Sequence, residues 1–208
     1  MPATAPKAPR LTGEQRREQI LDVTKALAGE RGFHAISIDA VARRAGITRP
    51  VVYGHFDDLA GLLRALVERE GARAVGQLMK LLPTPDAAKD PEEALLGALR
   101  AFLEAVREEP VTWQLVLMPS EGNPEILRER AITIRRAVTD QLAALTPQVL
   151  AGTDIPPPPD PELSALTMQA VAEDAARLLL AHPDEFPIER LMTHAEWIVG
   201  RMGLRGAS

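Results

Sequence analysis

Three segments of this chain carry the same signal for the start of a helix. Asp90-Pro91-Glu92, Asn123-Pro124-Glu125 and Asp160-Pro161-Glu162 each place an Asp or Asn before a proline and a glutamate. The Asx oxygen can accept a hydrogen bond from a free backbone N–H, and the proline needs no donor in the first turn. The glutamate interacts favourably with the positive end of the helix dipole. Each segment therefore predicts a helix that begins near its proline.

The remaining segments also favour helices. Thr12 and Gln15 have the spacing of a capping box, and Gly32 is placed to end the helix that they begin. No stretch shows the sustained alternation of a β-strand bounded by turns. We predict an all-α protein of about nine helices. Two of them lie between residues 36 and 56, and the others are expected at about 12–31, 59–82, 91–108, 110–118, 124–146, 161–181 and 187–203.

Composition restricts the class of protein. The chain has 208 residues, of which 46% are hydrophobic and 25% charged, and it has no cysteine. These values are typical of a globular protein without disulfides. Residues 1–10 contain three prolines and no apolar core, so we expect a flexible tail and no secretion signal. No apolar run approaches membrane-spanning length, and a cytoplasmic location is the expectation.

Charge is unevenly distributed along the chain. The formal net charge is −5, but residues 1–56 contain nine Lys/Arg and only five Asp/Glu. Residues 57–208 contain 15 Lys/Arg and 24 Asp/Glu. A basic N-terminal region on an otherwise acidic chain is expected when only that end meets nucleic-acid phosphates.

Residues 36–56 predict two short helices joined by a tight turn. Ser37 can cap the first helix, and Gly46 suits the left-handed residue that ends it. Thr48 is expected to cap the second helix, and Val52 to anchor it inward. This is a helix-turn-helix, an arrangement that can place its second helix in the major groove of DNA.

The sequence over about residues 14–66 resembles the tetracycline-repressor (TetR) family of transcriptional regulators. Four segments carry the resemblance: Arg31-Gly32-Phe33, Ser37-Ile38-Asp39-Ala40-Val41-Ala42, Ala45-Gly46-Ile47-Thr48 and Val52-Tyr53-Gly54-His55-Phe56. The family resemblance implies a homodimer with its two helix-turn-helix units in successive major grooves of double-stranded DNA, and a ligand pocket in each C-terminal region.

Several residues are candidates for contact with DNA. Arg49 could pair with guanine O6 and N7, or it could contact a phosphate. Tyr53 and Ser37 are expected to bond phosphates, whereas His55 could bond a phosphate or cap its helix. Arg44 is a possible phosphate contact whose alternative is a solvated face. By position the resemblance places these residues at the DNA: Ser37, Thr48, Arg49, Pro50, Val51, Tyr53 and His55.

One position departs from the family pattern. Members often have a phosphate-contacting lysine three residues after the phenylalanine that corresponds to Phe56, where this chain has Leu59. Asp57 and Asp58 precede it. We therefore expect DNA binding that is weaker or more selective.

We divide the chain into a tail (1–10), a helix-turn-helix domain (11–57) and a ligand-binding and dimerisation domain (58–208). The last two helices each carry an apolar stripe that suits a four-helix dimer interface, although packing within one chain is the alternative. The stripes are formed by Leu163, Leu166, Ala170 and Leu178, and by Leu191, Ala195, Ile198 and Met202.

A small-molecule site is expected among the helices of the C-terminal domain. The low aromatic content, 3%, favours a mainly aliphatic pocket for a lipophilic effector. Core packing is the alternative for each candidate. The candidates are Phe102, Trp113, Leu117, Met118, Met168 and Gln169.

These observations predict a ligand-responsive DNA-binding regulator, a repressor released from a palindromic operator by its effector. The alternative is an all-α ligand-sequestering or interaction protein whose DNA binding is weak or lost. The four histidines are scattered, and no phosphate loop or nucleophile motif occurs. We therefore expect no enzyme activity, no metal site and no cofactor.

Overall fold

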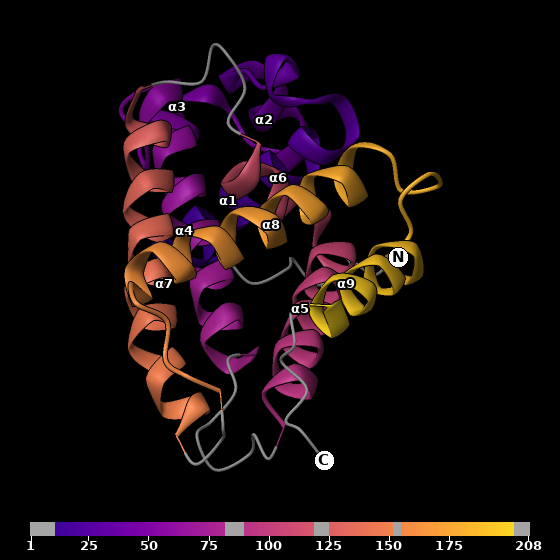
Figure 1. The fold of residues 1–208 in the computed structure, drawn as a ribbon. Coiled ribbons are helices and arrows are strands. Elements are labelled where there is room, and N and C mark those ends of the chain that lie inside the picture. The colour runs from indigo at the N-terminus through magenta and orange to yellow at the C-terminus, as the bar shows by residue number, and fades with distance from the viewer. Residues whose placement is uncertain (1–10, 82–89, 119–124, 152–154, 202–208) are drawn as a thin grey trace, which may run out of the picture. The chain divides into compact units, whose positions relative to one another are not determined.

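The computed structural model describes residues 11–81, 90–118, 125–151 and 155–201, and the regular secondary structure of these residues is helical (Figure 1). It forms nine α-helices and one 3₁₀ turn there, with no strand, which confirms the all-α prediction. The elements are α1 (Gly13–Arg31), η1 (Phe33–Ala35), α2 (Ile38–Ala45), α3 (Arg49–Tyr53), α4 (Leu59–Leu81), α5 (Pro91–Glu108), α6 (Pro110–Leu117), α7 (Glu125–Leu150), α8 (Pro161–Ala181) and α9 (Ile188–Arg201).

The chain forms two compact units, Met1–Leu66 and Val67–Ser208. The helix α4 runs across this division and contributes residues to both. The predicted tail, residues 1–10, and the Asn123-Pro124 start signal lie outside the described residues. Among the helices that are described, none is both long and apolar enough to cross a membrane.

The helix caps predicted at Thr12, Asp90 and Asp160 are present at the atomic level. An oxygen of Asp90 accepts the N–H of Glu92 at 2.8 Å, and one of Asp160 accepts the N–H of Leu163 at 2.9 Å. Thr12 and Gln15 bond each other's backbone N–H groups, which completes the predicted capping box. These local bonds explain why α5 and α8 begin where the sequence predicts.

The turn between α2 and α3 fixes the helix-turn-helix. Gly46 adopts a left-handed conformation with φ of 66°, and the next residue, Ile47, donates its N–H to the carbonyl of Ala42 at 3.0 Å. Val41 and Val52 are fully buried. The small side chain of Ala42 is also buried, which permits close packing of α2 and α3.

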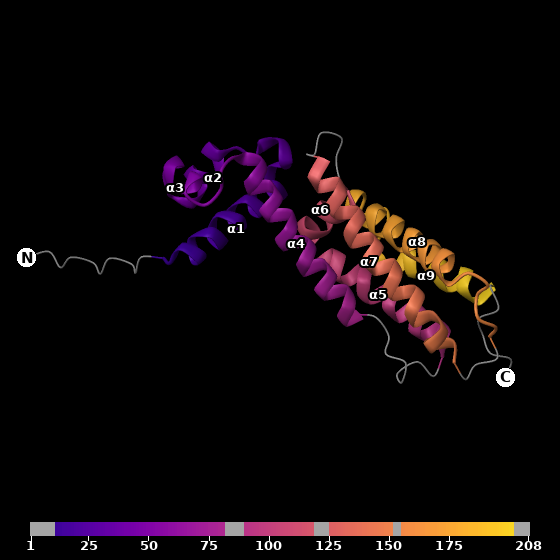
Figure 2. The same cartoon turned by 90° about the vertical axis from the view of Figure 1, so that its left-hand side faces the viewer.

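The C-terminal unit is a helical bundle (Figure 2), and a cluster of buried apolar side chains lies among its helices. The helix α7 packs along α8, and α9 packs against α5. Arg100 of α5 forms a double hydrogen bond with Glu189 of α9, at 2.8 and 3.2 Å, and this bond lowers the pKa of the Glu189 carboxyl. Five helices supply the buried core: Ala74 of α4, Leu103 and Val106 of α5, Trp113 and Leu117 of α6, Ala176 and Leu179 of α8, and Ile188 and Met192 of α9.

Two local features differ from the sequence prediction. The helix α7 continues through Pro147 to Leu150 rather than ending at residue 146. Proline provides no N–H, but the side chains of Thr146 and Gln148 donate to the carbonyls of Leu142 and Ala144. These bonds supplement the backbone pattern around the proline. In addition, residues 33–35 form a 3₁₀ turn that the sequence did not indicate.

The cap at α8 gives a first test of the structure. Replacing Asp160 with alanine removes the acceptor for the Leu163 N–H and should lower the free energy of unfolding by about 0.5–2 kcal/mol. Asp184→Ala is the matched control, because Asp184 is exposed and forms no bond within the described residues. Urea denaturation measures both variants, and an equal effect of the two would contradict the capping role.

The turn at Gly46 gives a second test. Gly46→Ala should destabilise the protein by about 1–2 kcal/mol, because an L-residue resists the left-handed conformation. Gly76→Ala is the control, since an added Cβ has open space at both positions and only Gly46 has a positive φ. Gly76→Ala should raise stability by about 1 kcal/mol in the interior of α4. Thermal unfolding that shifted in the same direction for both variants would refute this account.

Candidate DNA-binding face

The helix α3 presents most of its side chains to solvent. Val52, on its inner side, is fully buried, and so almost entirely is Phe56, which follows the helix. Tyr53 is 52% exposed and Val51 is 38% exposed. Thr48, Arg49 and Pro50 are exposed as well. Five of the predicted DNA-contacting residues therefore lie together on the outer surface of α3 and its first turn.

The hydroxyls of Ser37 and Thr48 are in different situations. Ser37 caps α2 as predicted, because its Oγ accepts the N–H of Ala40 at 3.1 Å. Its hydroxyl proton can still be donated to an acceptor such as a phosphate oxygen. The predicted Thr48 cap is wrong: the Thr48 side chain makes no capping bond, and its backbone carbonyl accepts the N–H of Val51 instead. The Thr48 hydroxyl is therefore free to contact a ligand.

Two predicted DNA-contacting arginines are paired with carboxylates. The Nε of Arg49 donates to Oδ1 of Asp39, which lies in the first turn of α2. Arg44 donates to Glu30 of α1 at 2.6 Å. All four side chains remain about half exposed, with exposed fractions between 45% and 62%. These are surface ion pairs, which contribute little to the stability of the fold.

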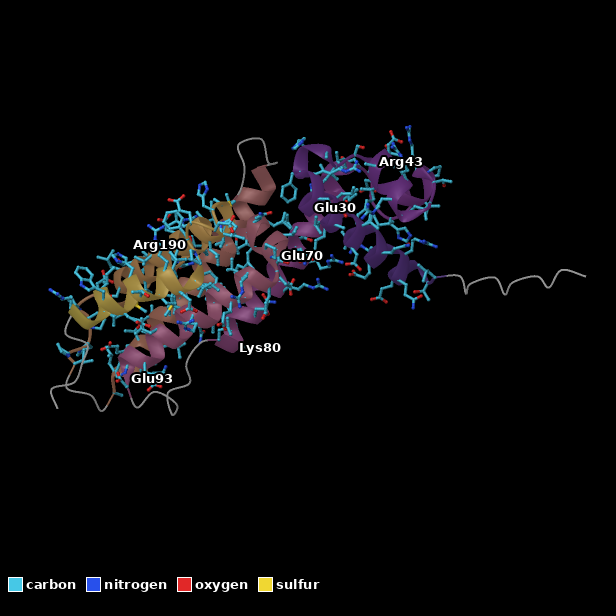
Figure 3. All side chains as sticks on the ribbon, turned by 90° about the vertical axis from the view of Figure 1, so that its right-hand side faces the viewer. Glu30, Arg43, Glu70, Lys80, Glu93 and Arg190 are labelled. Carbon is cyan, nitrogen blue, oxygen red and sulfur yellow. The ribbon has the colours of Figure 1, made fainter. Side chains whose placement is uncertain are left out.

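Three neighbouring side chains complete this surface. Arg43 is exposed and has no ion-pair partner within the described residues (Figure 3). His55 is only partly exposed. The guanidinium of Arg17, from α1, lies over the ring of Phe56 at 5.0 Å from its centroid. Arg17 therefore covers the ring of Phe56, which is buried shortly after the end of α3.

The start of α4 carries no basic side chain. Asp58 caps this helix, since its Oδ1 accepts the N–H of Gly61 at 2.6 Å. Leu59 is partly buried, and Asp57 is exposed. The carboxylate of Asp58 therefore occupies a backbone donor that a phosphate would otherwise use.

The predicted ligand-binding residues do not form one group. Phe102, Trp113 and Leu117 lie in the same buried core, where the rings of Phe102 and Trp113 meet edge to face at 5.1 Å. Met118 is 41% exposed, and Met168 is only partly buried. Three of the six candidates are therefore brought together by the fold.

The sixth candidate, Gln169, belongs to a polar network between α7 and α8. Thr139 donates to its carbonyl oxygen at 2.5 Å, and its amide donates to Glu173 at 2.9 Å. Arg135 and Arg177 pair with the other oxygen of Glu173, at 3.2 and 2.9 Å. The two guanidinium groups balance the negative charge of buried Glu173, because a buried carboxylate is costly unless it is paired.

A second polar cluster, centred on Glu70, was not identified from the sequence. Glu70 of α4 is fully buried and accepts a hydrogen bond from Thr112 of α6 at 2.6 Å. The sequence pattern that could have identified buried Glu70 is its helical spacing from apolar Leu66 and Ala74. Close by in sequence, the amide of Gln77 donates to Glu109 at 3.0 Å. The Nε1 of Trp113 and the Oε1 of Gln77 are buried without a hydrogen-bond partner in the part of the chain that is described.

Comparison with known proteins identifies relatives of this chain. The sequence model of the family described as "Bacterial regulatory proteins, tetR family" matches residues 20–66. The transcriptional activator FasR of Mycolicibacterium smegmatis is 30% identical over 107 residues, which cover 51% of this chain and 48% of FasR. The chain therefore spans about half the length of that relative.

Solved structures share the fold over nearly the whole chain. A TetR-like transcriptional regulator from Rhodococcus sp. RHA1 is 25% identical, with a TM-score of 0.66 over 93% of this chain and 98% of its own. The regulator FadR from Bacillus subtilis, solved with stearoyl-CoA, has a TM-score of 0.68 at 14% identity, over 92% and 99% of the two chains. The helix-turn-helix region of this chain, residues 20–66, therefore matches the TetR family of bacterial regulatory proteins, and the chain shares the fold of a solved TetR-like regulator.

Proposed function

We propose that this protein is a transcriptional regulator that binds double-stranded DNA through α2 and α3. The observation that carries the proposal is the exposed outer surface of α3, with Arg49, Val51 and Tyr53 outside and Val52 buried. A side chain at the start of the second helix of a helix-turn-helix can reach base edges in the major groove. Ser37 and Tyr53 supply hydroxyls for phosphate oxygens.

The charge distribution supports the same surface. Nine of the 24 Lys/Arg residues lie in the first 56 positions, where only five carboxylates occur. The acidic remainder of the chain would repel DNA, so the N-terminal region is the favoured point of contact. Cytoplasmic location follows from this proposal, since the DNA is there.

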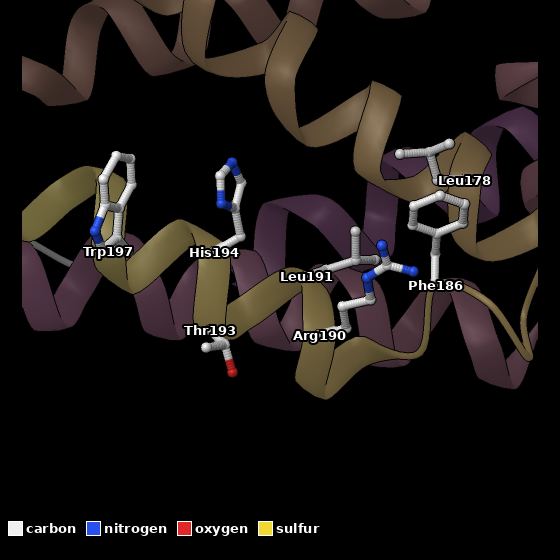
Figure 4. Close-up of a pocket in the computed structure, with 7 residues that line it drawn as sticks. All are labelled: Leu178, Phe186, Arg190, Leu191, Thr193, His194 and Trp197. Atoms are coloured by element: carbon white, nitrogen blue, oxygen red, sulfur yellow. The ribbon is translucent and has the colours of Figure 1, made fainter.

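We further propose that the functional form is a homodimer associated through α8 and α9. Leu163 and Val171 of α8 are about 60% exposed, and Trp197 of α9 is 57% exposed. Trp197 also lines a pocket of about 760 Å³, in which Leu178 of α8 lies close to Phe186, and His194 and Trp197 project to the same side (Figure 4). An isologous dimer would bury these apolar side chains and pair two DNA-binding units for a palindromic site.

The proposed effector is a lipophilic small molecule bound within the C-terminal unit. The core around Phe102, Trp113 and Leu117 is largely apolar, and the unpaired Nε1 of Trp113 could donate a hydrogen bond to a ligand. FadR, which shares the fold, was solved with stearoyl-CoA. An effector that favours one conformation of this unit could act on the DNA-binding unit through α4, which belongs to both.

We propose that DNA binding represses transcription and that the effector relieves it. FasR is named an activator, so the sign of regulation needs its own experiment. A reporter placed behind the bound site should become more active when this gene is deleted. Lower activity would show that the protein is an activator. A protein that sequesters ligands without binding DNA would leave the reporter unchanged.

The DNA-binding surface is tested by Arg49→Ala. This variant should lose about 1–3 kcal/mol of affinity for the specific site and relax selectivity at one base position. Arg43→Ala is the control, since loss of an exposed positive charge outside α3 should affect binding to all sequences alike. Gel shifts over a range of salt concentrations measure both effects. If wild-type protein forms no specific complex at any salt concentration, the proposal is wrong.

The dimer interface is tested by Val171→Glu. A charge at this exposed position of α8 should convert a dimer into a monomer, because two carboxylates would be buried in the interface. Ile132→Glu on α7 is the matched control, since Ile132 is 67% exposed and lies outside α8 and α9. Light scattering at micromolar concentration gives the mass. A monomeric wild type, or dissociation of the Ile132 variant alone, would contradict the interface.

A further inference from the structure

The ion pair between Arg49 and Asp39 connects the two helices of the helix-turn-helix. Arg49 is the first residue of α3, and Asp39 lies in the first turn of α2. The contact uses Nε of the guanidinium and Oδ1 of the carboxylate. The pair is exposed, with 62% of the Arg49 side chain and 48% of the Asp39 side chain accessible. Such a pair contributes little to the free energy of unfolding, so stability of the fold does not explain its presence.

The atoms used in the pair determine which donors of Arg49 remain. A guanidinium has five N–H donors in a rigid plane, one on Nε and two on each terminal nitrogen. Asp39 engages Nε, and neither terminal nitrogen has a partner within the described residues. The two terminal nitrogens form a fork that matches the O6 and N7 acceptors on the major-groove edge of guanine.

The pair also limits the conformations available to Arg49. A free arginine side chain loses up to about 2 kcal/mol of conformational entropy when it is fixed on binding. Because the Asp39 carboxylate already holds Nε, the Arg49 side chain loses less conformational entropy when its two terminal nitrogens contact a base. The negative charge of Asp39 also repels the phosphates of DNA. The smaller entropy loss and the repulsion of phosphates both favour contact of Arg49 with guanine over a non-specific contact with the DNA backbone.

We infer that Asp39 is a positioning residue for sequence recognition: by holding Nε of Arg49 it presents the terminal nitrogens end-on to guanine. The inference rests on the proposed DNA-binding function. It assigns to Asp39 a role in selectivity rather than in affinity. It also separates this pair from Arg44–Glu30, in which the carboxylate engages a terminal nitrogen of the arginine.

The experiment begins with full-length wild-type protein and a pool of random double-stranded DNA. The site that it enriches is then made with each single-base change, and affinities are measured for wild type, Asp39→Ala and Asp39→Asn. Asp39→Ala should reduce discrimination at the guanine read by Arg49 by about tenfold. Its affinity for random DNA should be unchanged or higher. Asp39→Asn should retain part of the discrimination, because its amide oxygen can still accept from Nε.

Two controls isolate the proposed role. Glu30→Gln removes a carboxylate from the other arginine pair and should change the affinity for all sequences alike. In an Arg49→Ala background, Asp39→Ala should leave base discrimination unaltered, since Asp39 acts through Arg49. Thermal unfolding confirms that each variant is folded.

The outcomes distinguish the inference from the proposed function. Wild-type protein that enriches no sequence overturns DNA recognition and the inference with it. Wild-type protein that enriches a site, with Asp39→Ala showing the same base discrimination, overturns the positioning role alone. A discrimination loss that persists in the Arg49→Ala background would also overturn it.

Discussion

The packing of α3 against α2 is the constraint on which the proposed DNA-binding surface depends. A helix of five residues is not stable on its own in water, so its position must come from tertiary contacts. Fully buried Val41 and Val52 supply them, and the left-handed turn at Gly46 sets the direction in which the chain re-enters a helix. Once Val52 is inside, the geometry of the helix places Val51 and Tyr53 outside.

The carboxylates around this surface modify what its arginines can do. Asp39 and Glu30 hold Arg49 and Arg44, and Asp58 caps the start of α4. Each reduces the attraction of the surface for phosphate in general. A DNA-binding protein with weak electrostatic attraction to phosphates depends more on base contacts for its affinity. Phosphate contacts carry no sequence information, so its binding is more selective. This is the physical basis for expecting selective rather than strong binding.

The sequence predicted the features that depend on neighbouring residues. The capping bonds of Thr12 and Asp160, the bounds of α5 and α8 and the turn at Gly46 were all predicted from short segments. The ion pairs were not, because Asp39 and Arg49 are ten residues apart and meet only when α2 and α3 are packed. The cluster at Glu70 likewise joins residues 42 positions apart. Met118 and Met168 were predicted to line a ligand pocket, whereas the fold leaves Met118 exposed and Met168 only partly buried.

In the proposed binding mode, α3 enters the major groove with Arg49 toward guanine. Methylation interference tests it most directly, because methylation of guanine N7 modifies the major-groove edge that Arg49 would contact. On DNA bound by the full-length protein, the account predicts interference at guanines in two symmetric half-sites in major grooves on one side of the duplex. Interference confined to adenine N3 in the minor groove, or absent from every guanine of the bound site, would contradict it.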